Sequence, residues 1–457
     1  MKHETINSVY FIGIGGIGMS ALARYFKAMG KRVSGYDRTE TVLTKQLQKE
    51  GIDIHFIENL DLIPKDVNLV VYTPAVPKSH SELIFYRENN FQIKKRAEVL
   101  GMVVKSHFTV AVAGTHGKTT ISAMVAHILK YSSIDCTAFV GGIMKNYDSN
   151  FILPDSSNQS RYTGTTKMVV EADEYDRSFL QLHPDIAVIT SMDADHLDIY
   201  GNENQIKETF SLFAKQVKEA GILIYKQELP LNGFKVKSFT YSINEVADYS
   251  AQNITVKNGN FVFDVQTPTS KIENINISLP GRHNVENTVA AIAVADRLKI
   301  DADKIKKSLE TFQGIKRRFE HIVKTEKLVF IDDYAHHPTE LKAAISAARE
   351  LYPGKKITGI FQPHLFTRTR DFADEFASSL ELLDELLLLE IYPAREEPIE
   401  GVNSKMLLEK INLKNKVLLT KDELLTQIGK KNLQILLTLG AGDIDKLVEP
   451  IKNKLKI

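Results

Sequence analysis

The fold is decided by the stretch HFTVAVAGTHGKTT, residues His107 to Thr120. Its apolar run FTVAVA predicts a buried strand, and the segment TISAMVAHILK that follows predicts a helix. In the connection between such elements, successive backbone N–H groups can cradle phosphates, a lysine can reach the β and γ oxygens, and a threonine hydroxyl can ligate Mg²⁺. The candidates for binding a nucleoside triphosphate are Gly114, Thr115, His116, Gly117, Lys118, Thr119 and Thr120.

This loop is shorter than the standard phosphate-binding loop. Val112 stands five residues before Gly117, where the standard pattern has glycine. The strand, the glycines, Lys118 and the threonines nevertheless keep the required order. A structural turn with an exposed lysine is the alternative, and the order of residue types favours the phosphate site.

Strand and helix patterns alternate on both sides of this stretch. Short runs rich in valine and isoleucine alternate with amphipathic segments from SVYFIGIG onward, and the pattern restarts at His107 and again at Glu326. Such alternation is typical of βαβ units and parallel sheets. We therefore expect an α/β protein of three domains, residues 1–106, 107–316 and 317–457.

A glycine motif follows the first predicted strand. Gly13, Gly15 and Gly18 form G-x-G-x-x-G, with Gly16 between them, and Asp37 lies at the end of the next predicted strand. Glycines at this spacing let the backbone approach a pyrophosphate, whose charge meets free N–H groups at a helix N-terminus. The motif favours a nucleotide diphosphate without distinguishing NAD from another one, and a tight structural turn is the remaining alternative.

Acidic and histidine side chains follow two further predicted strands. The cluster EADEYD begins at Glu171 after the run TKMVV, and the cluster DADH ends at His196 after the run DIAVIT. Ligand sites of open α/β sheets gather at such strand ends, and carboxylate oxygens suit Mg²⁺. Glu171 and His196 are the candidate metal ligands, although each acidic or histidine side chain alone is more often a solvated or structural residue.

Two segments near residue 317 carry further polar candidates. The segment GRHNVEN opens a predicted helix, and its His283 and Asn287 can face the edge of a purine, while helix capping by Asn284 is an equal alternative. Arg318 lies at the expected domain boundary, where a guanidinium can stabilise charge on a transferring phosphoryl group. A solvated charge is the alternative there.

The third predicted domain also places polar side chains after its strands. Asp333 and His336 follow the strand of EKLVFIDDYAHHPTE, and Arg368 follows the strand KITGIF. Arginine is well shaped to hold a carboxylate through two parallel hydrogen bonds. An amino acid presents such a carboxylate, so this pattern favours an amino-acid site in the third domain.

Charge and composition narrow the classes of partner. The 58 basic and 57 acidic residues give a net charge of +1, so no global field draws nucleic acid or an anionic membrane. The single Cys136 cannot form an internal disulfide, and the start MKHETINSVYFIG lacks a secretory pattern, so we expect a cytoplasmic protein. The apolar stretches are too short for membrane insertion.

Taken in chain order, these motifs resemble those of the Mur ligase family along nearly the whole chain. The resemblance rests on GIGGIGMS, GTHGKTT, EADEYD, DADHLD, GRHNVEN, KRRFE, DDYAHHPTE, FQPH with RTRD, and LGAGDI. It implies an N-terminal Rossmann-like domain for a UDP-sugar, a central P-loop ATPase domain with a mainly parallel sheet, and a C-terminal Rossmann-like domain for an amino acid. It also implies ATP and Mg²⁺ as cofactors, with UDP-N-acetylmuramate and L-alanine as the molecules joined.

The resemblance further implies a role for each candidate residue. By similarity, Lys118 and Thr119 hold the ATP phosphates, and Thr119, Glu171 and His196 hold magnesium. In the same way, His283 and Asn287 would contact adenine, and Asp333 would contact the ribose. Arg318 would contact the γ-phosphate, and His336 and Arg368 would contact alanine. The catalytic candidates are Lys118, Arg318 and His336, and the glycine turn with Asp37 would hold a uridine diphosphate rather than NAD.

Three other functions remain open at this point. A recycling ligase that attaches a tripeptide to UDP-N-acetylmuramate shares GTHGKT and EADEYD, although DYAHHPTE and YDRSFL look closer to the alanine-adding group. An NAD-dependent oxidoreductase predicts nicotinamide binding without ATP turnover. A non-catalytic nucleotide-binding regulator predicts ATP binding without phosphate release that depends on an amino acid. One position departs from the family pattern: Leu365 stands where many relatives carry arginine after FQPH.

Overall fold

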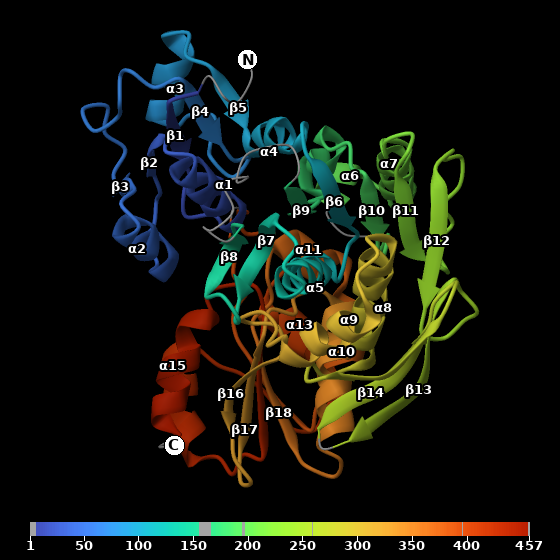
Figure 1. Ribbon diagram of the computed structural model, residues 1–457. Helices are drawn as coiled ribbons and strands as arrows, with labels where there is room; N and C mark the ends of the chain where they lie inside the picture. Colours follow the sequence, from blue (N-terminus) through green and yellow to red (C-terminus); the bar gives the residue numbers. More distant parts are fainter. Residues whose placement is uncertain (1–5, 155–165, 194–196, 258, 395, 456–457) are drawn as a thin grey trace. The chain divides into compact units, whose positions relative to one another are not determined.

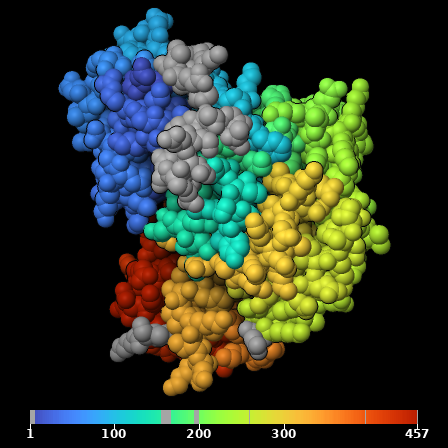
Figure 2. All heavy atoms as spheres, in the orientation of Figure 1, coloured from blue at the N-terminus to red at the C-terminus, as the bar shows by residue number. Residues whose placement is uncertain are grey.

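The computed structural model describes residues 6–154, 166–193, 197–257, 259–394 and 396–455, and the remaining residues are drawn in grey in Figures 1 and 2. The chain divides into two compact units. The first unit comprises Met1–Gln252, Val265–Ile272 and Asn287–Phe312, and the second comprises Asn253–Asp264, Glu273–Glu286 and Gln313–Ile457.

The first sheet of the chain has five parallel strands in the order β3-β2-β1-β4-β5. Its central strand β1 is completely buried, as expected for a parallel strand covered on both faces. The strand order reverses between β1 and β4, and ligands bind α/β sheets at such points. The elements are β1 (Ser8–Ile12), α1 (Ile17–Ala28), β2 (Arg32–Tyr36), α2 (Val42–Lys49), β3 (Asp53–His55), β4 (Leu69–Tyr72), α3 (Ser81–Glu88), β5 (Ile93–Lys95) and α4 (Arg96–Val104).

The second sheet has ten strands in the order β15-β14-β13-β12-β11-β10-β6-β9-β7-β8. From β12 to β7 the neighbouring strands run parallel, and β8 is antiparallel to β7. Strand β6 lies between β10 and β9, so the loops that follow these three strands meet at one edge of the sheet. The elements are β6 (Phe108–Ala113), α5 (Lys118–Tyr131), β7 (Cys136–Met144), β8 (Ser149–Ile152), β9 (Lys167–Glu171), the 3₁₀ helix η2 (Tyr175–Gln181), β10 (Ile186–Ile189), α6 (Leu197–Tyr200), α7 (Glu203–Lys215), β11 (Ile222–Lys226), β12 (Lys237–Ser242), β13 (Tyr249–Lys257), β14 (Asn260–Gln266), β15 (Lys271–Ile277), α8 (Arg282–Arg297) and α9 (Ala302–Thr311).

The third sheet has six strands in the order β16-β17-β21-β18-β19-β20. Strand β16 is antiparallel to β17, and the other neighbours are parallel. Buried apolar clusters cover both faces of this sheet. Its elements are β16 (Glu320–Lys324), β17 (Val329–Asp333), α10 (Pro338–Leu351), β18 (Ile357–Phe361), α11 (Phe366–Asp371), α12 (Ala373–Leu380), β19 (Glu385–Leu388), α13 (Ser404–Lys410), β20 (Lys416–Leu418), α14 (Lys421–Gln427), η3 (Ile428–Lys430), β21 (Ile435–Leu439) and α15 (Asp445–Lys454).

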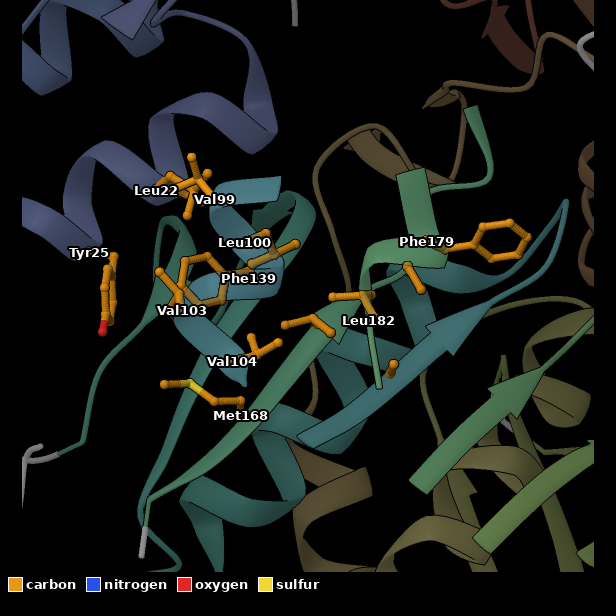
Figure 3. Close-up of a cluster of buried hydrophobic side chains, with 14 of the residues drawn as sticks. Leu22, Tyr25, Val99, Leu100, Val103, Val104, Phe139, Met168, Phe179 and Leu182 are labelled. Carbon is orange, nitrogen blue, oxygen red and sulfur yellow. The ribbon is translucent and has the colours of Figure 1, made fainter. Parts of the chain in front are cut away.

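An apolar cluster inside the first unit joins helices of the first sheet to strands of the second. Leu22 of α1 and Val103 of α4 lie in the same buried cluster as Phe139 of β7 and Met168 of β9 (Figure 3). Burying one such side chain stabilises a fold by about 1.5–3 kcal/mol. The glycine turn before α1 and the phosphate loop before α5 are thus held in one packed body.

The α/β fold class with mainly parallel sheets, predicted from the sequence, is confirmed. The strand FTVAVA is β6, the helix after the phosphate loop is α5, and α10 begins at Pro338. Within the described ranges, no helix has the length and apolar character needed to cross a membrane.

Candidate functional site

The phosphate-binding loop joins β6 to α5 and requires glycine at two positions. Gly114 has φ +134°, and a Cβ atom there would collide with Thr190 Oγ1 and lie 2.9 Å from the backbone nitrogen of Ser191. Gly117, directly before α5, has φ +81°, and a Cβ atom there would lie 2.5 Å from Oδ1 of Asn287. The two glycines therefore fix the loop at the N-terminus of α5, the end of a helix that attracts phosphate groups.

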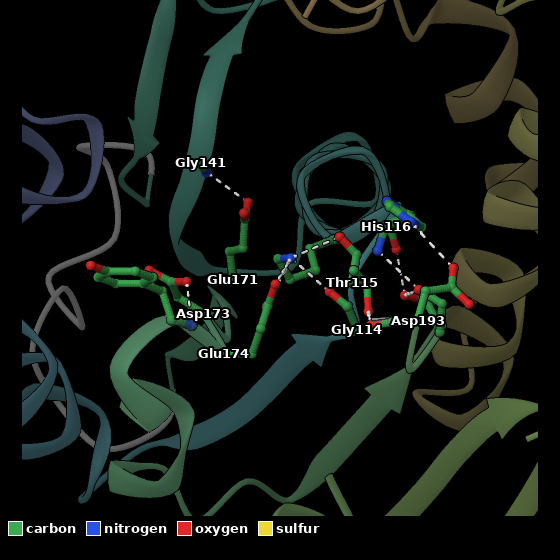
Figure 4. A network of polar contacts seen from close by, with 12 residues as sticks. Gly114, Thr115, His116, Gly141, Glu171, Asp173, Glu174 and Asp193 are labelled. Atoms are coloured by element: carbon green, nitrogen blue, oxygen red, sulfur yellow. Dashed lines mark hydrogen bonds and ion pairs between the residues drawn. The ribbon is translucent and has the colours of Figure 1, made fainter. Parts of the chain in front are cut away.

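Lys118 is the first residue of α5, and its ammonium group is turned back onto the loop. Its Nζ atom donates to the carbonyl oxygen of Gly114 at 2.6 Å and to that of Thr115 at 3.2 Å. It also pairs with the carboxylate of Glu174, which approaches from the segment after β9 (Figure 4). The side chains of Lys118 and Glu174 are only 14% and 6% exposed, so this ion pair is shielded from water.

Burial shifts the titration of this pair. It raises the pKa of Glu174 to about 7, although the charge of Lys118 acts in the opposite direction. Burial lowers the pKa of Lys118, but Glu174 and Glu171 outweigh this effect, so the pKa stays above its ordinary value. The lysine is therefore positively charged at neutral pH, as contact with phosphate requires.

Two predicted metal ligands lie at the same edge of the sheet. Glu171 ends β9, and its Oε2 accepts a hydrogen bond from the backbone of Gly141 at 2.9 Å, whereas Thr119 is on the first turn of α5. Carboxylate and hydroxyl oxygens suit Mg²⁺, which usually completes its shell with water and substrate phosphates. In the described part of the chain, no three histidine, cysteine or acidic side chains come together as a metal site. His196, the third predicted ligand, lies outside the described residues.

Two carboxylates that follow β9 also pair with cations at the junction of β5 and α4. Asp173 accepts from Arg96 at 2.7 Å, and Asp176 accepts from Lys95 at 2.7 Å. Arg96 also lies against the glycine turn, since a Cβ atom on Gly18 would be 2.9 Å from its Nη1. One acidic segment thus contacts both the phosphate loop and the residues beside the glycine turn.

Thr115 and His116 are held close to the sheet edge. His116 Nε2 lies 3.2 Å from Asp193 Oδ2, and its backbone N–H donates to Ser191 Oγ at 2.9 Å. Thr115 Oγ1 donates to the carbonyl oxygen of Asp193 at 3.1 Å (Figure 4), and Thr120 is buried in the first turn of α5. These contacts tie the loop to the end of β10.

The N-terminal glycine turn is shaped by Asp37. Its Oδ2 accepts from the backbone N–H of Gly15 at 2.7 Å, and a Cβ atom on Gly15 would lie 2.8 Å from the same oxygen. Gly13 has φ +88° and closes the turn by accepting from the N–H of Gly16, the N-cap residue of α1. The structure therefore brings the glycines and Asp37 together at the carboxyl end of β1.

The second unit gathers three further predicted residues around β17. Asp333 accepts from the backbone N–H groups of Phe319 and Ala335, each at 2.7 Å. Burial raises the pKa of Asp333 to about 6, against the opposing charge of Arg318. Burial also lowers the pKa of His283 to about 4, and Arg318 adds to this effect. His283 is therefore neutral at pH 7.

His336 and Arg368 both lie close to His364. The rings of His336 and His364 are 6.0 Å apart between centroids, and Arg368 Nη1 is 3.4 Å from His364 Nδ1. Arg368 is 5% exposed. His336 Nδ1 lies 2.9 Å from the carbonyl oxygen of Tyr334 and 3.1 Å from Glu340 Oε2.

Three family models match successive parts of the chain. The Mur ligase family, catalytic domain, matches residues 8–108, the Mur ligase middle domain matches 112–295, and the Mur ligase, glutamate ligase domain, matches 317–442. The chain belongs to the Mur ligase family. It is an ATP-dependent ligase that forms amide bonds.

Relatives of this Mur ligase align from end to end. A UDP-N-acetylmuramate–L-alanine ligase of Flavobacterium johnsoniae is 53% identical over 100% of this chain and 99% of its own, and one of Parabacteroides distasonis is 51% identical over 99% and 98%. The crystal structure of UDP-N-acetylmuramate–alanine ligase from Thermotoga maritima is 29% identical, with a TM-score of 0.82 over 98% of this chain and 99% of that chain. A murein peptide ligase from Psychrobacter arcticus has the same fold, with 24% identity and a TM-score of 0.75 over 98% of each chain.

Several polar residues of this Mur ligase contact the predicted site residues but were not themselves predicted. Four examples are Arg96, Glu174, Glu340 and His364. Three of them stand inside or beside quoted motifs, but a motif does not tell which of several neighbouring polar side chains faces the site. Arg96 carries no local signal, because its partner Asp173 is 77 residues away in the sequence.

Proposed function

We propose that the protein joins L-alanine to UDP-N-acetylmuramate in its ATP-dependent reaction. The proposal rests on the end-to-end similarity to L-alanine ligases, with 53% identity over 100% of this chain and 99% of the relative. A phosphate loop with a charged, buried Lys118 supports the use of a triphosphate. The reaction product would be UDP-N-acetylmuramoyl-L-alanine, a precursor of peptidoglycan. We propose a cytoplasmic location for the protein.

In this proposal the ATP phosphates bind at the N-terminus of α5. Lys118 holds the β and γ oxygens, and the loop residues Gly114 to Thr120 supply backbone N–H groups. Asn287 and His283 hold adenine, and Asp333 holds the ribose. His283 is neutral at pH 7, so it can both donate and accept a hydrogen bond.

We assign Mg²⁺ to Thr119, Glu171 and His196. The oxygen donors of Thr119 and Glu171 fit this hard cation, and Glu171 is fixed through its bond to the backbone of Gly141. When bound, the ion would screen repulsion between the phosphates and an approaching carboxylate. Lys118 contributes positive charge at the same place.

The reaction would then proceed in two steps. The muramate carboxylate attacks the γ-phosphorus of ATP, with Arg318 stabilising charge on the phosphoryl group, and an acyl phosphate and ADP form. The amine of alanine attacks the acyl carbon, the carbon–oxygen bond to phosphate breaks, and phosphate leaves. Arg368 would hold the alanine carboxylate, and His336 would orient the amine or take its proton.

We place the sugar nucleotide at the N-terminal glycine turn. Gly13, Gly15, Gly16, Gly18 and Asp37 would form its diphosphate site, supported by the bond between Gly15 and Asp37 and by the position of the turn at the reversal of strand order. We further propose domain limits of 1–106, 107–316 and 317–457. Family matches to residues 8–108, 112–295 and 317–442 support a division of the chain into three parts.

Addition of a tripeptide instead of alanine is the alternative function, because murein peptide ligases share the fold. The release of phosphate from ATP decides between the two functions. It is measured with UDP-N-acetylmuramate and with either alanine or the tripeptide as the acceptor. We expect alanine to give a kcat/KM at least about 100-fold higher. A preference for the tripeptide would overturn the proposal.

A further inference from the structure

Glu340 lies between two residues to which the proposed reaction assigns different steps. It is in the first turn of α10, and its side chain is 15% exposed. Its Oε2 accepts from the backbone N–H of His336 at 3.1 Å and lies 3.1 Å from Nδ1 of the same residue. Its Oε1 lies 3.5 Å from Nη1 of Arg318.

The surroundings of His336 Nδ1 determine which ring nitrogen carries the proton. The carbonyl oxygen of Tyr334, at 2.9 Å, and the carboxylate of Glu340 can only accept hydrogen bonds. Nδ1 is therefore protonated in the neutral ring, and the lone pair is on Nε2. An imidazole held in this way can accept a proton at Nε2.

We infer that Glu340 is a positioning residue that fixes His336 with Nε2 as the proton acceptor for the incoming amine. This inference rests on the proposed function, in which His336 meets the amino acid. As the carbon–nitrogen bond forms and phosphate leaves with its electron pair, one amine proton passes to Nε2. The negative charge of Glu340 then stabilises the imidazolium, as a carboxylate beside a catalytic histidine does.

The other charged and titratable groups near this pair do not replace Glu340. Arg318 and Arg368 are cations without an acceptor atom for the Nδ1 proton, and they contact Glu340 and His364, respectively, whereas His364 faces the ring of His336 from 6.0 Å. Asp333 directs both of its oxygens to backbone N–H groups. Glu340 is therefore the carboxylate placed to act on His336.

The test compares Glu340→Gln with the wild-type protein in two reactions. Hydroxylamine, an amine that is largely uncharged at neutral pH, traps an acyl phosphate without a base, so hydroxamate formation reports the first step. We expect Glu340→Gln to lower kcat/KM for alanine by roughly 10- to 100-fold, with hydroxamate formation changed less than about threefold. Glu350→Gln is the matched control, because Glu350 is on the same helix and pairs with Arg282 at 3.8 Å.

A double variant separates action through His336 from action through Arg318. Adding Glu340→Gln to His336→Ala should lower the alanine reaction by less than about twofold, since the residue acts through a side chain that is already absent. Equal losses of hydroxamate and alanine products, or effects that multiply in the double variant, would overturn the inference.

A measurement without substrates keeps this test independent of the proposed function. The ¹⁵N shifts of His336, assigned by comparison with His336→Ala, should show the neutral ring protonated at Nδ1 in the wild-type protein and a smaller share of this tautomer in Glu340→Gln. An unchanged share of the tautomer would contradict the inference even if alanine is the substrate. A wild-type protein that releases no phosphate with alanine would contradict the proposed function alone.

Discussion

Lys118 and Glu174 form a buried ion pair, with Nζ 3.0 Å from Oε1 and 2.9 Å from Oε2. Together with the carbonyl oxygens of Gly114 and Thr115, Glu174 occupies all three N–H donors of the lysine. A triphosphate must therefore displace at least one of these partners to reach Lys118. Glu174 thus favours the charged form of Lys118 and holds its ammonium group in place.

Replacing Lys118 should separate the two nucleotide sites. We expect Lys118→Ala to lower phosphate release at least about 100-fold, because the charge that meets the phosphates is lost. Binding of UDP-N-acetylmuramate, measured by calorimetry, should change less than about threefold. Lys130→Ala, at the other end of α5, is the control and should turn over like the wild-type protein. If Lys118→Ala lost both phosphate release and UDP-N-acetylmuramate binding, the two nucleotides would not have separate sites.

Glu174 should give the folding stability a distinctive pH dependence. Burial raises its pKa from 4.5 to about 7, so between these values the folded protein holds a proton that the unfolded chain has released. Stability therefore falls as pH rises through this window, by at most about 1.4 kcal/mol per pH unit for one proton. Urea unfolding at about pH 5 and about pH 7.5 should show a smaller difference for Glu174→Gln than for wild type. Glu203→Gln, which changes an exposed residue on α7, should show the same pH difference in unfolding free energy as wild type. The prediction is refuted if Glu174→Gln also shows the wild-type difference.

Two neighbouring glycines should respond differently to alanine. In Gly15→Ala the new Cβ atom would lie 2.8 Å from both Asp37 Oδ2 and Thr44 Cγ2, whereas in Gly16→Ala the nearest atom is 3.5 Å away. We expect Gly15→Ala to cost about 1–3 kcal/mol of stability and to weaken sugar-nucleotide binding. Gly16→Ala should leave the thermal midpoint nearly unchanged. Equal shifts of the two midpoints would show that Asp37 does not constrain the turn.

Replacing Arg317 should mainly lower stability, whereas replacing the adjacent Arg318 should mainly lower turnover. Arg317 donates to Asp332, which is 2% exposed, and to the carbonyl oxygen of Gly440 at 2.7 Å. Arg317→Ala should therefore lower the free energy of unfolding by about 3 kcal/mol, since it leaves a buried carboxylate with fewer partners. Arg318→Ala should abolish turnover with little loss of stability. The reverse pattern, seen by chemical unfolding and phosphate release, would contradict the role proposed for Arg318.

The sequence predicts the parts of this protein whose causes are local. The strand β6, the glycine loop and α5 follow from an apolar run, two glycines with positive φ and a helical pattern, all within residues 107–131. The start of α10 at Pro338 is equally local.

The partners of the site residues depend on contacts that are distant in the sequence. EADEYD offers four carboxylates of similar chemistry, and nothing in their spacing tells that Glu174 meets Lys118 while Asp173 meets Arg96. The backbone makes these partners harder to predict, because Asp176 and Arg177 both have φ +54° and turn the segment abruptly.

The most direct test of the central claim is release of phosphate from ATP by the purified protein with UDP-N-acetylmuramate and a panel of amino acids. We expect rapid release only when the sugar nucleotide and L-alanine are both present, with one UDP-N-acetylmuramoyl-L-alanine formed for each phosphate. ATP left intact in that mixture, or nicotinamide dinucleotide bound at the N-terminal glycine turn in place of the sugar nucleotide, would contradict the account.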